Sequence, residues 1–319
     1  MSNRVMNRFG EKIKKFFLEL PPPEAIFQLN SHSLTGIRLS PKERTIKHSC
    51  VLPLKPGEIL PSFDRANIPE PADIESKIEE AKRLLHLEEG AVAVLLPELC
   101  FKVALFAVDS LPLSPQEREK MVWWRVKKIM PLLPDDTRLS FDLIKSRESE
   151  KILASVARAS VVREYEGAFF RKRLKVETVT LPTLNLLHLL NERRQSDEDA
   201  LLANIDEDSV GLLALVNSEI VLYRVKPFLS DGRWVSSSED RLETIIKEME
   251  NTLHFIEDRE KKKINVLWIR QGLKDDRMDV MSFFKKRFPF SIRSVDSLVP
   301  FEMPLEEKHL FSPLVGQFL

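Results

Sequence analysis

The chain has 319 residues, which is enough to bury a substantial core and to form two lobes. Its 49 basic and 49 acidic side chains cancel, so no overall electric field draws it to nucleic acid or to acidic surfaces. No apolar run approaches the roughly 20 residues that span a bilayer, and we expect no transmembrane helix.

Glycine is scarce and scattered, with nine residues of which no two lie close together in the sequence. Phosphate-binding loops need clustered glycines, because the backbone must turn sharply and approach the ligand without a Cβ in the way. The sequence therefore contains no P-loop and no GxGxxG motif. Its two cysteines, Cys50 and Cys100, and its six histidines show no metal-binding spacing, and the cysteine usage fits a reducing cytoplasm.

Residues 1–22 are predicted to form an amphipathic helix that ends at a run of prolines. A basic polar face opposite phenylalanines is typical of a helix that lies in the plane of a membrane surface. The alternative is a helix that packs on its own domain. The residues expected to face the membrane are Phe9, Ile13, Phe16 and Phe17, with Lys14 and Lys15 beside them.

The next elements predict a mixed α/β domain. Residues 25–29 and 36–39 favour a β-hairpin, and an apolar stripe over residues 74–85 favours a helix. Two apolar strands follow from residue 92. Ser114, Pro115 and Glu117 then stand at the positions of an N-cap, a first-turn proline and a capping-box glutamate, which predicts the start of another helix.

A polar break at residues 191–200 is the best candidate for a boundary between lobes. Beyond it, residues 201–225 predict a three-stranded meander, residues 242–256 a long helix, and residues 264–269 a buried strand. Strands followed by crossing helices therefore occur twice along the chain, although no repeat is visible in the sequence itself.

The segments LPLSPQEREKMVWWRVKKIMPLLPDDTRLSFDL and ILASVARASVVREYEGAFFRKRLKVETVTLPTLNLLHLL resemble the family-specific insert of the PilM family, whose members are actin-like proteins of type IV pilus assembly. The resemblance covers roughly residues 95–190. It implies an α/β, actin-like (ribonuclease H-like) two-lobed fold with a PilM/FtsA-type inserted subdomain. The expected division is an N-terminal helix (1–22), a first lobe (23–190) with the insert at about 97–175, and a second lobe (191–319).

The same resemblance locates a nucleotide site that has lost its usual residues. In actin-like ATPases an Asp and nearby small residues at the tip of each lobe's hairpin hold the metal shell and the phosphates. The corresponding positions here are Gln28, Asn30 and Thr35 in the first lobe, Asn204 and Asp206 in the second, and Gly272 in the adenosine-side loop. We therefore expect no nucleotide cofactor and no ATPase activity. The alternative is an ATPase with an unusual phosphate site, in which Asp206 or Asp208 holds a shifted metal.

Trp124 is predicted to lie on the helix face opposite Val122 and Val126, ringed by lysines. An aromatic anchor in such a setting is typical of an interface, while packing under another part of the insert is the alternative. The predicted partner-binding residues are Trp124, Lys120, Lys127 and Lys128.

PilM relatives hold the N-terminal cytoplasmic peptide of the membrane protein PilN between the first lobe and the insert. The resemblance thus implies a non-enzymatic scaffold, peripheral at the inner membrane, that links a PilN-like protein to pilus motor or platform proteins. From the balanced charge we expect no nucleic-acid partner, and self-association and a role in a related type II secretion system remain open.

Overall fold

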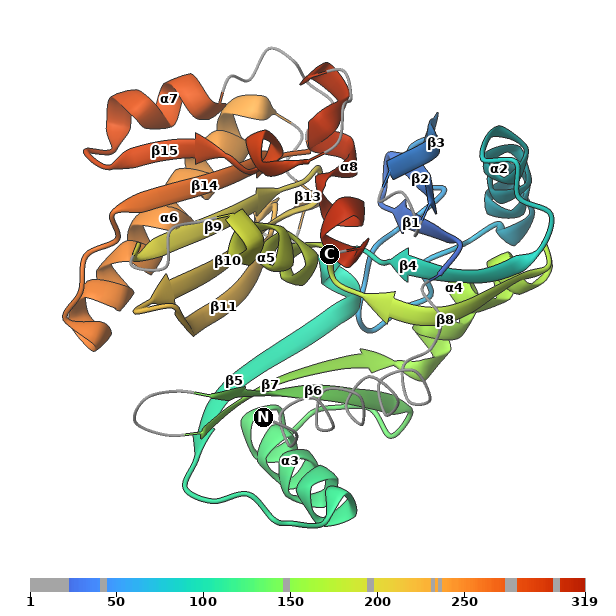
Figure 1. Cartoon of the computed structure of the whole chain (residues 1–319). Coiled ribbons are helices and arrows are strands. Elements are labelled where there is room, and N and C mark those ends of the chain that lie inside the picture. The colour runs from blue at the N-terminus through green and yellow to red at the C-terminus, as the bar shows by residue number, and fades with distance from the viewer. Residues whose placement is uncertain are drawn as a thin grey trace, which may run out of the picture.

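The computed structural model describes residues 23–40, 45–145, 150–193, 198–230, 233–234, 237–272, 280–300 and 305–318. The predicted N-terminal helix, with Phe9, Ile13, Phe16, Phe17, Lys14 and Lys15, lies outside the described residues. Two lobes stand side by side, and a smaller inserted subdomain lies below them (Figure 1).

The first lobe is built on a five-stranded sheet of order β3-β2-β1-β4-β8. Strand β2 is antiparallel to both of its neighbours, β1 and β3, whereas β4 and β8 run parallel to β1. Alternate residues point to opposite faces, as in any strand, so Phe27 faces one helical layer and Ile26 the other. Helices α2 and α4 cover the Phe27 side. The strands are Ala25–Leu29, Ser33–Ser40, Thr45–Pro53, Gly90–Leu95 and Leu174–Thr180, and the helices are Pro71–Leu84 and Ala159–Phe170.

The second lobe repeats this arrangement with the order β11-β10-β9-β14-β15 and with the same strand directions. Its helices α6 and α7 pack against one face through Met249 and Phe284. This duplication confirms the predicted pattern of two lobes. The elements are β9 (Ala200–Ile205), β10 (Ser209–Val216), β11 (Glu219–Pro227), β12 (Leu229–Ser230), β13 (Arg233–Trp234), α6 (Ser238–Glu260), β14 (Val266–Gln271), α7 (Val280–Arg287), β15 (Ser291–Ser294) and the 3-10 turn η2 (Val295–Leu298).

The insert is a three-stranded antiparallel sheet of order β5-β7-β6, with helix α3 below it (Figure 1). Val122 and Val126 of α3 pack on one face of this sheet, and Leu153 on the other face packs toward the second lobe. Ser114 accepts a hydrogen bond from the Glu117 amide, so α3 begins at its predicted cap. The elements are the 3-10 turn η1 (Glu98–Cys100), β5 (Phe101–Val108), α3 (Pro115–Ile129), β6 (Thr137–Lys145) and β7 (Glu150–Arg158).

The inserted sheet ends at Arg158, before the expected limit near residue 175. The reason is that α4 packs on the first lobe through Tyr165 and Phe169, and β8 pairs with β4. The apolar spacing of α4 is the same whichever domain it covers, so sequence alone does not assign it.

Each lobe's last helix packs on the sheet of the other lobe. Helix α5 (Pro182–Arg193) follows the first sheet but buries its leucines against Leu202 and Trp268 of the second. Helix α8 (Leu305–Phe318) follows the second sheet but buries Phe311 and Leu314 against the first. The two helices contact each other closely at Gly316, where a Cβ would lie 1.9 Å from the carbonyl oxygen of Asn185. Because α5 and α8 each pack on the sheet of the other lobe, the tips of the first hairpins of both lobes lie in one region.

Candidate functional site

The tip of the first-lobe hairpin is closed by its own side chain. Asn30 Oδ1 accepts hydrogen bonds from the backbone amides of His32 (3.2 Å) and Ser33 (2.7 Å) and from the Ser33 hydroxyl (3.0 Å). Turn amides of this kind bind phosphate when they are free. Here the amides of His32 and Ser33 are already bonded to Asn30, so neither is free to bind a phosphate.

Gln28 stands where the resemblance places a metal-orienting carboxylate. It is opposite Thr35 in the β1–β2 register, and both side chains are buried. A neutral amide supplies no negative charge to hold a hydrated divalent cation. Gln28, Asn30 and Thr35 thus lie in one hairpin, and none of the three side chains carries a charge.

The tip of the second-lobe hairpin is closed by an arginine from the neighbouring strand. Arg270 is 1% exposed, and its guanidinium lies 3.2 Å from Asn204 Oδ1 and 3.3 Å from Asp206 Oδ2. Its Nε donates to the carbonyl of His309 in α8 at 2.8 Å. A Cβ at Gly272 would come within 2.2 Å of this guanidinium, which explains the glycine at that position.

Beneath Asn204 a buried polar network joins the two lobes. Asn204 Nδ2 donates to the Thr183 hydroxyl at 3.1 Å, and the Thr183 amide donates to the Glu98 carboxylate at 2.7 Å. The Tyr223 hydroxyl also bonds to Glu98. Burial raises the pKa of Glu98, while these hydrogen bonds oppose the rise. The network thus ties β9 and β11 of the second lobe to η1 and α5 of the first.

The two hairpin tips meet each other. His32 Nδ1 lies 3.8 Å from Asp206 Oδ1, and the Ser31 hydroxyl bonds to the Asp208 carboxylate. Burial, with the charges of Asp206 and Glu207, raises the pKa of Asp208 to about 6, and the bond to Ser31 and the charge of Arg241 only partly offset this. Protein groups therefore occupy the region between the hairpins.

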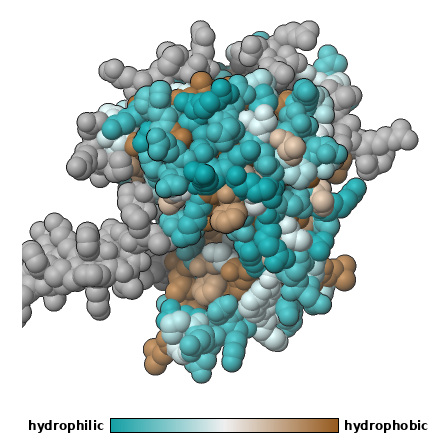
Figure 2. Space-filling model, turned by 90° about the vertical axis from the view of Figure 1, so that its right-hand side faces the viewer, coloured by the Kyte–Doolittle hydropathy of each residue, from teal (hydrophilic) through white to brown (hydrophobic). Residues whose placement is uncertain are grey.

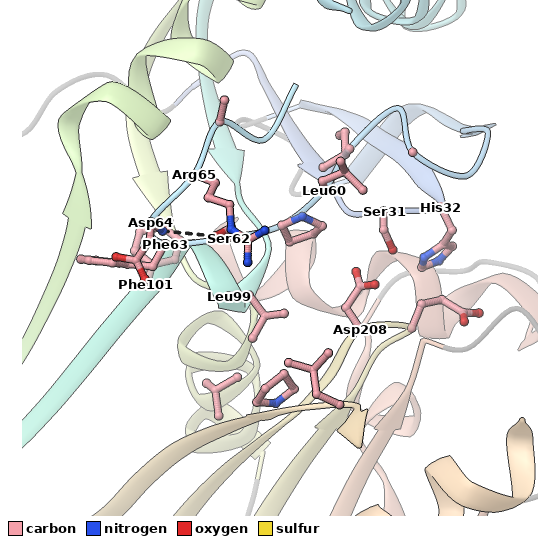
Figure 3. Close-up of a pocket in the computed structure, with 18 of the residues that line it drawn as sticks. Ser31, His32, Leu60, Ser62, Phe63, Asp64, Arg65, Leu99, Phe101 and Asp208 are labelled. Carbon is pink, nitrogen blue, oxygen red and sulfur yellow. Dashed lines mark hydrogen bonds between the residues drawn. The ribbon is translucent and has the colours of Figure 1, made fainter. Parts of the chain in front are cut away.

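A cavity of about 840 Å³ opens beside these tips. Ser31, His32 and Asp208 form one end, Leu60 and Leu99 lie in the middle, and Phe63 and Phe101 form the other end (Figure 3). The walls come from the first-lobe loop 54–66, the start of β5, and β11. Figure 2 also shows hydrophobic residues in a hollow between the upper part of the molecule and the smaller part below. A volume of this size is typical of a ligand site.

Trp124 lies elsewhere. It is 59% exposed on the outer face of α3, and Lys128 Nζ lies 5.2 Å from its ring centroid. Lys120 and Lys127 are also exposed on this helix. The helix geometry therefore turns Trp124 away from Val122 and Val126, as predicted. However, α3 lies on the side of the insert away from the lobes (Figure 1), so these residues do not line the cavity.

The described residues contain no group of three or more histidine, cysteine or acidic side chains placed to hold a metal. Both cysteines are buried, which raises the pKa of each thiol to about 12.

Among the residues that the structure describes, no helix has the length and apolar character required to cross a membrane.

No protein-family model and no curated protein matches the sequence. Among solved structures, the chain is similar to one of a PilM-PilN type IV pilus biogenesis complex, with a TM-score of 0.76 and 16% identity over 93% of this chain and 97% of that one. A Bacteroides thetaiotaomicron protein of actin-like ATPase fold gives a TM-score of 0.53 and 9% identity, over 90% and 95%. The chain has the actin-like fold. The fold implied by the resemblance to PilM proteins is thereby confirmed.

Sequence reasoning did not identify Arg270 or Glu98 as site residues. Arg270 ends a run of buried residues in VLWIRQ, and a charge after such a run is usually exposed at a strand end. Glu98 follows a buried strand in the same way. The only available signal was a charged residue directly after an apolar strand, and that signal does not say which distant groups will pair with it.

Proposed function

We propose that the chain is a non-enzymatic actin-like scaffold of type IV pilus assembly or a related secretion system, and that it binds the N-terminal cytoplasmic peptide of a PilN-like membrane protein. The observation that carries this proposal is the closure of both hairpin tips by Asn30 and Arg270. The amides of His32 and Ser33 are bonded to Asn30, and the side chains of Asn204 and Asp206 are bonded to Arg270, so these groups are not free to hold phosphates.

Electrostatics further disfavour a nucleotide in the cavity. The hairpin end carries Glu207 and Asp208, whose charges repel phosphate oxygens. Arg241 is bonded to Glu207, so its charge is already partly neutralised. This end of the cavity is therefore poorly suited to a polyphosphate.

Titration calorimetry separates the two functions. With Mg-ATP we expect no saturable heat, whereas the N-terminal peptide of a single-span membrane protein encoded beside this chain should bind stoichiometrically. Saturable Mg-ATP binding with micromolar affinity would overturn the scaffold proposal. Absence of binding by any such peptide would remove the proposed partner.

The outer face of α3 is proposed as a second partner contact. Interface tryptophans often contribute about 2 kcal/mol or more, or roughly thirtyfold in affinity. Trp124→Ala should therefore weaken partner binding by that order and leave the free energy of unfolding unchanged within about 0.5 kcal/mol. The matched control is Phe170→Ala, which removes a 75% exposed ring from α4 and should change neither quantity. If Trp124→Ala leaves binding intact, α3 is not a contact.

We also propose that residues 1–22 hold the protein peripherally at the cytoplasmic face of the inner membrane. Flotation with vesicles of anionic lipid should be weakened by Phe9→Ser or Phe16→Ser, because apolar burial is lost. Raised salt should weaken it too, because the charges of Lys14 and Lys15 are screened. Equal flotation of a chain that starts at Pro21 would show that the helix is not the anchor.

A further inference from the structure

The two most exposed large apolar side chains among the described residues flank helix α3. Leu113, directly before the N-cap, is 95% exposed, and Leu132, just after the last turn, is 90% exposed. Trp124 is exposed on the outer face of the helix between them. A single exposed leucine is ordinary on a protein surface. Two leucines at opposite ends of one helix, with a tryptophan between them, make the outer side of the insert apolar along the whole length of α3.

The same helix carries unneutralised positive charge. Residues 113–132 contain five basic and two acidic side chains, a net charge of +3. Lys127 and Lys128 are exposed in the last turn, and neither is paired with a carboxylate in the part of the chain that the structure describes. Elsewhere in the insert a cation such as Arg158 lies 3.0 Å from Asp136. The lysines of α3 are therefore available to an anionic partner.

The acidic residues of α3 leave this charge in place around Trp124. Glu117 and Glu119 both lie near the start of the helix, where they favour the positive end of its dipole. Lys128 Nζ lies 5.2 Å from the Trp124 ring centroid, and Arg125 lies 5.6 Å from it. Apolar and basic side chains are thus interleaved on one surface.

An anionic lipid surface matches this combination better than a protein does. Leucine is under-represented among the residues that dominate protein interfaces, and those residues fill packed pockets. The residues of α3 line no part of the cavity, and the helix lies on the side of the insert away from the lobes (Figure 1). At a membrane, aliphatic side chains enter the acyl region, tryptophan lies at the level of the headgroups, and lysines reach the phosphates.

We propose that the outer face of α3 binds directly to an anionic lipid surface. Leu113, Trp124 and Leu132 enter the lipid, and Lys120, Lys127 and Lys128 pair with its phosphates. This contact rests neither on residues 1–22 nor on the partner's peptide. A protein contact on the same face is the alternative, and vesicles of pure lipid separate the two.

A fluorescent reporter at position 132 tests the contact in the full chain. Cys50 and Cys100 are buried with a thiol pKa of about 12, so a thiol-reactive nitrobenzoxadiazole dye labels Leu132→Cys selectively. Vesicles of phosphatidylglycerol and phosphatidylcholine should brighten the dye and shift its emission to shorter wavelength, whereas phosphatidylcholine alone should do so weakly. The same dye at Phe170→Cys, on α4, should not respond even if residues 1–22 bind the vesicles.

Two pairs of substitutions in the chain labelled at position 132 test the charge. Lys127→Gln with Lys128→Gln should weaken binding to the anionic vesicles roughly thirtyfold, since each lysine near such a surface contributes about fivefold. Lys285→Gln with Lys286→Gln is the matched control. It removes the same charge from exposed positions of α7, at the opposite end of the molecule (Figure 1), and should change binding by less than about twofold.

Unchanged emission at position 132 with the anionic vesicles would overturn the inference, and flotation of the same sample would then assign membrane binding to another segment. Equal weakening by the two lysine pairs would also overturn it, because the attraction would depend only on net charge. If Trp124→Ala weakens the binding of the partner's peptide while the dye does not respond to lipid, the face is a protein contact and the proposed function stands without this inference.

Discussion

The tips of the two lobes' first hairpins occupy equivalent places in two sheets of the same strand order, but they are closed by different means. The first uses a neutral side chain, Asn30, that bonds to amides two and three residues away. The second uses a buried cation, Arg270, that bonds to Asp206 and to α8, both far away in the chain. A hairpin tip can thus be closed by a local turn or by tertiary structure, and we expect the two closures to contribute differently to stability.

Arg270→Leu should show the largest effect, because it leaves Asp206 and the His309 carbonyl without their buried partner. We expect a loss of about 3–5 kcal/mol in the free energy of unfolding, measured with urea. The control is Arg293→Leu in the adjacent strand, where the arginine is 41% exposed and pairs with Glu198. That change should cost under about 1 kcal/mol. Equal losses would mean that Arg270 has no special role in closing the second hairpin.

Asp208→Asn should stabilise the protein at neutral pH. The folded pKa of Asp208, about 6, lies above the ordinary value for aspartate, so its contribution to stability is fully present below pH 4 and is lost as the pH rises through 6. Asparagine carries no charge at any of these pH values, so the variant does not lose this stability as the pH rises. We expect its free energy of unfolding to exceed that of the natural chain by about 3 kcal/mol at pH 8 and to match it near pH 4. A gain that is constant from pH 4 to pH 8 would contradict the assignment.

Asn30→Gly should have the smallest effect on stability, about 1–2 kcal/mol, because only local hydrogen bonds are lost. It frees the amides of His32 and Ser33. Combined with Gln28→Asp, it returns the first hairpin to a composition suited to phosphate and metal. We nevertheless expect no heat on titration with Mg-ATP, because Arg270 and Asp206 still close the second hairpin. Saturable binding would show that the first hairpin alone excludes the nucleotide.

The same contrast explains what could be predicted from the sequence. The hairpins, the meander of the second lobe and the capped start of α3 depend on neighbouring residues, and their patterns are visible in the chain. The placement of Gln28 and Asn204 at the hairpins of the two lobes could also be predicted. The bonding of Arg270 to His309 could not, because a pairing between distant segments depends on how the lobes dock.

Two further features needed the structure for the same reason. The leucines of α5 predict a buried helix, but they do not say that the covering sheet belongs to the other lobe. The exposed position of Trp124 agrees with its helical phase, but the distance of α3 from the cavity follows from the packing of the inserted sheet.

The exchange of α5 and α8 between lobes also bears on how the protein is made. During synthesis all strands of both sheets leave the ribosome before α8 does. Until α8 arrives, one face of the first sheet, with Ile26, Ile37 and Leu95, has nothing to cover it. Nascent chains with such faces are prone to aggregate and depend on chaperones. The first lobe should therefore mature only after the second has been translated, and slowing the translation of the second lobe should reduce the yield of folded protein.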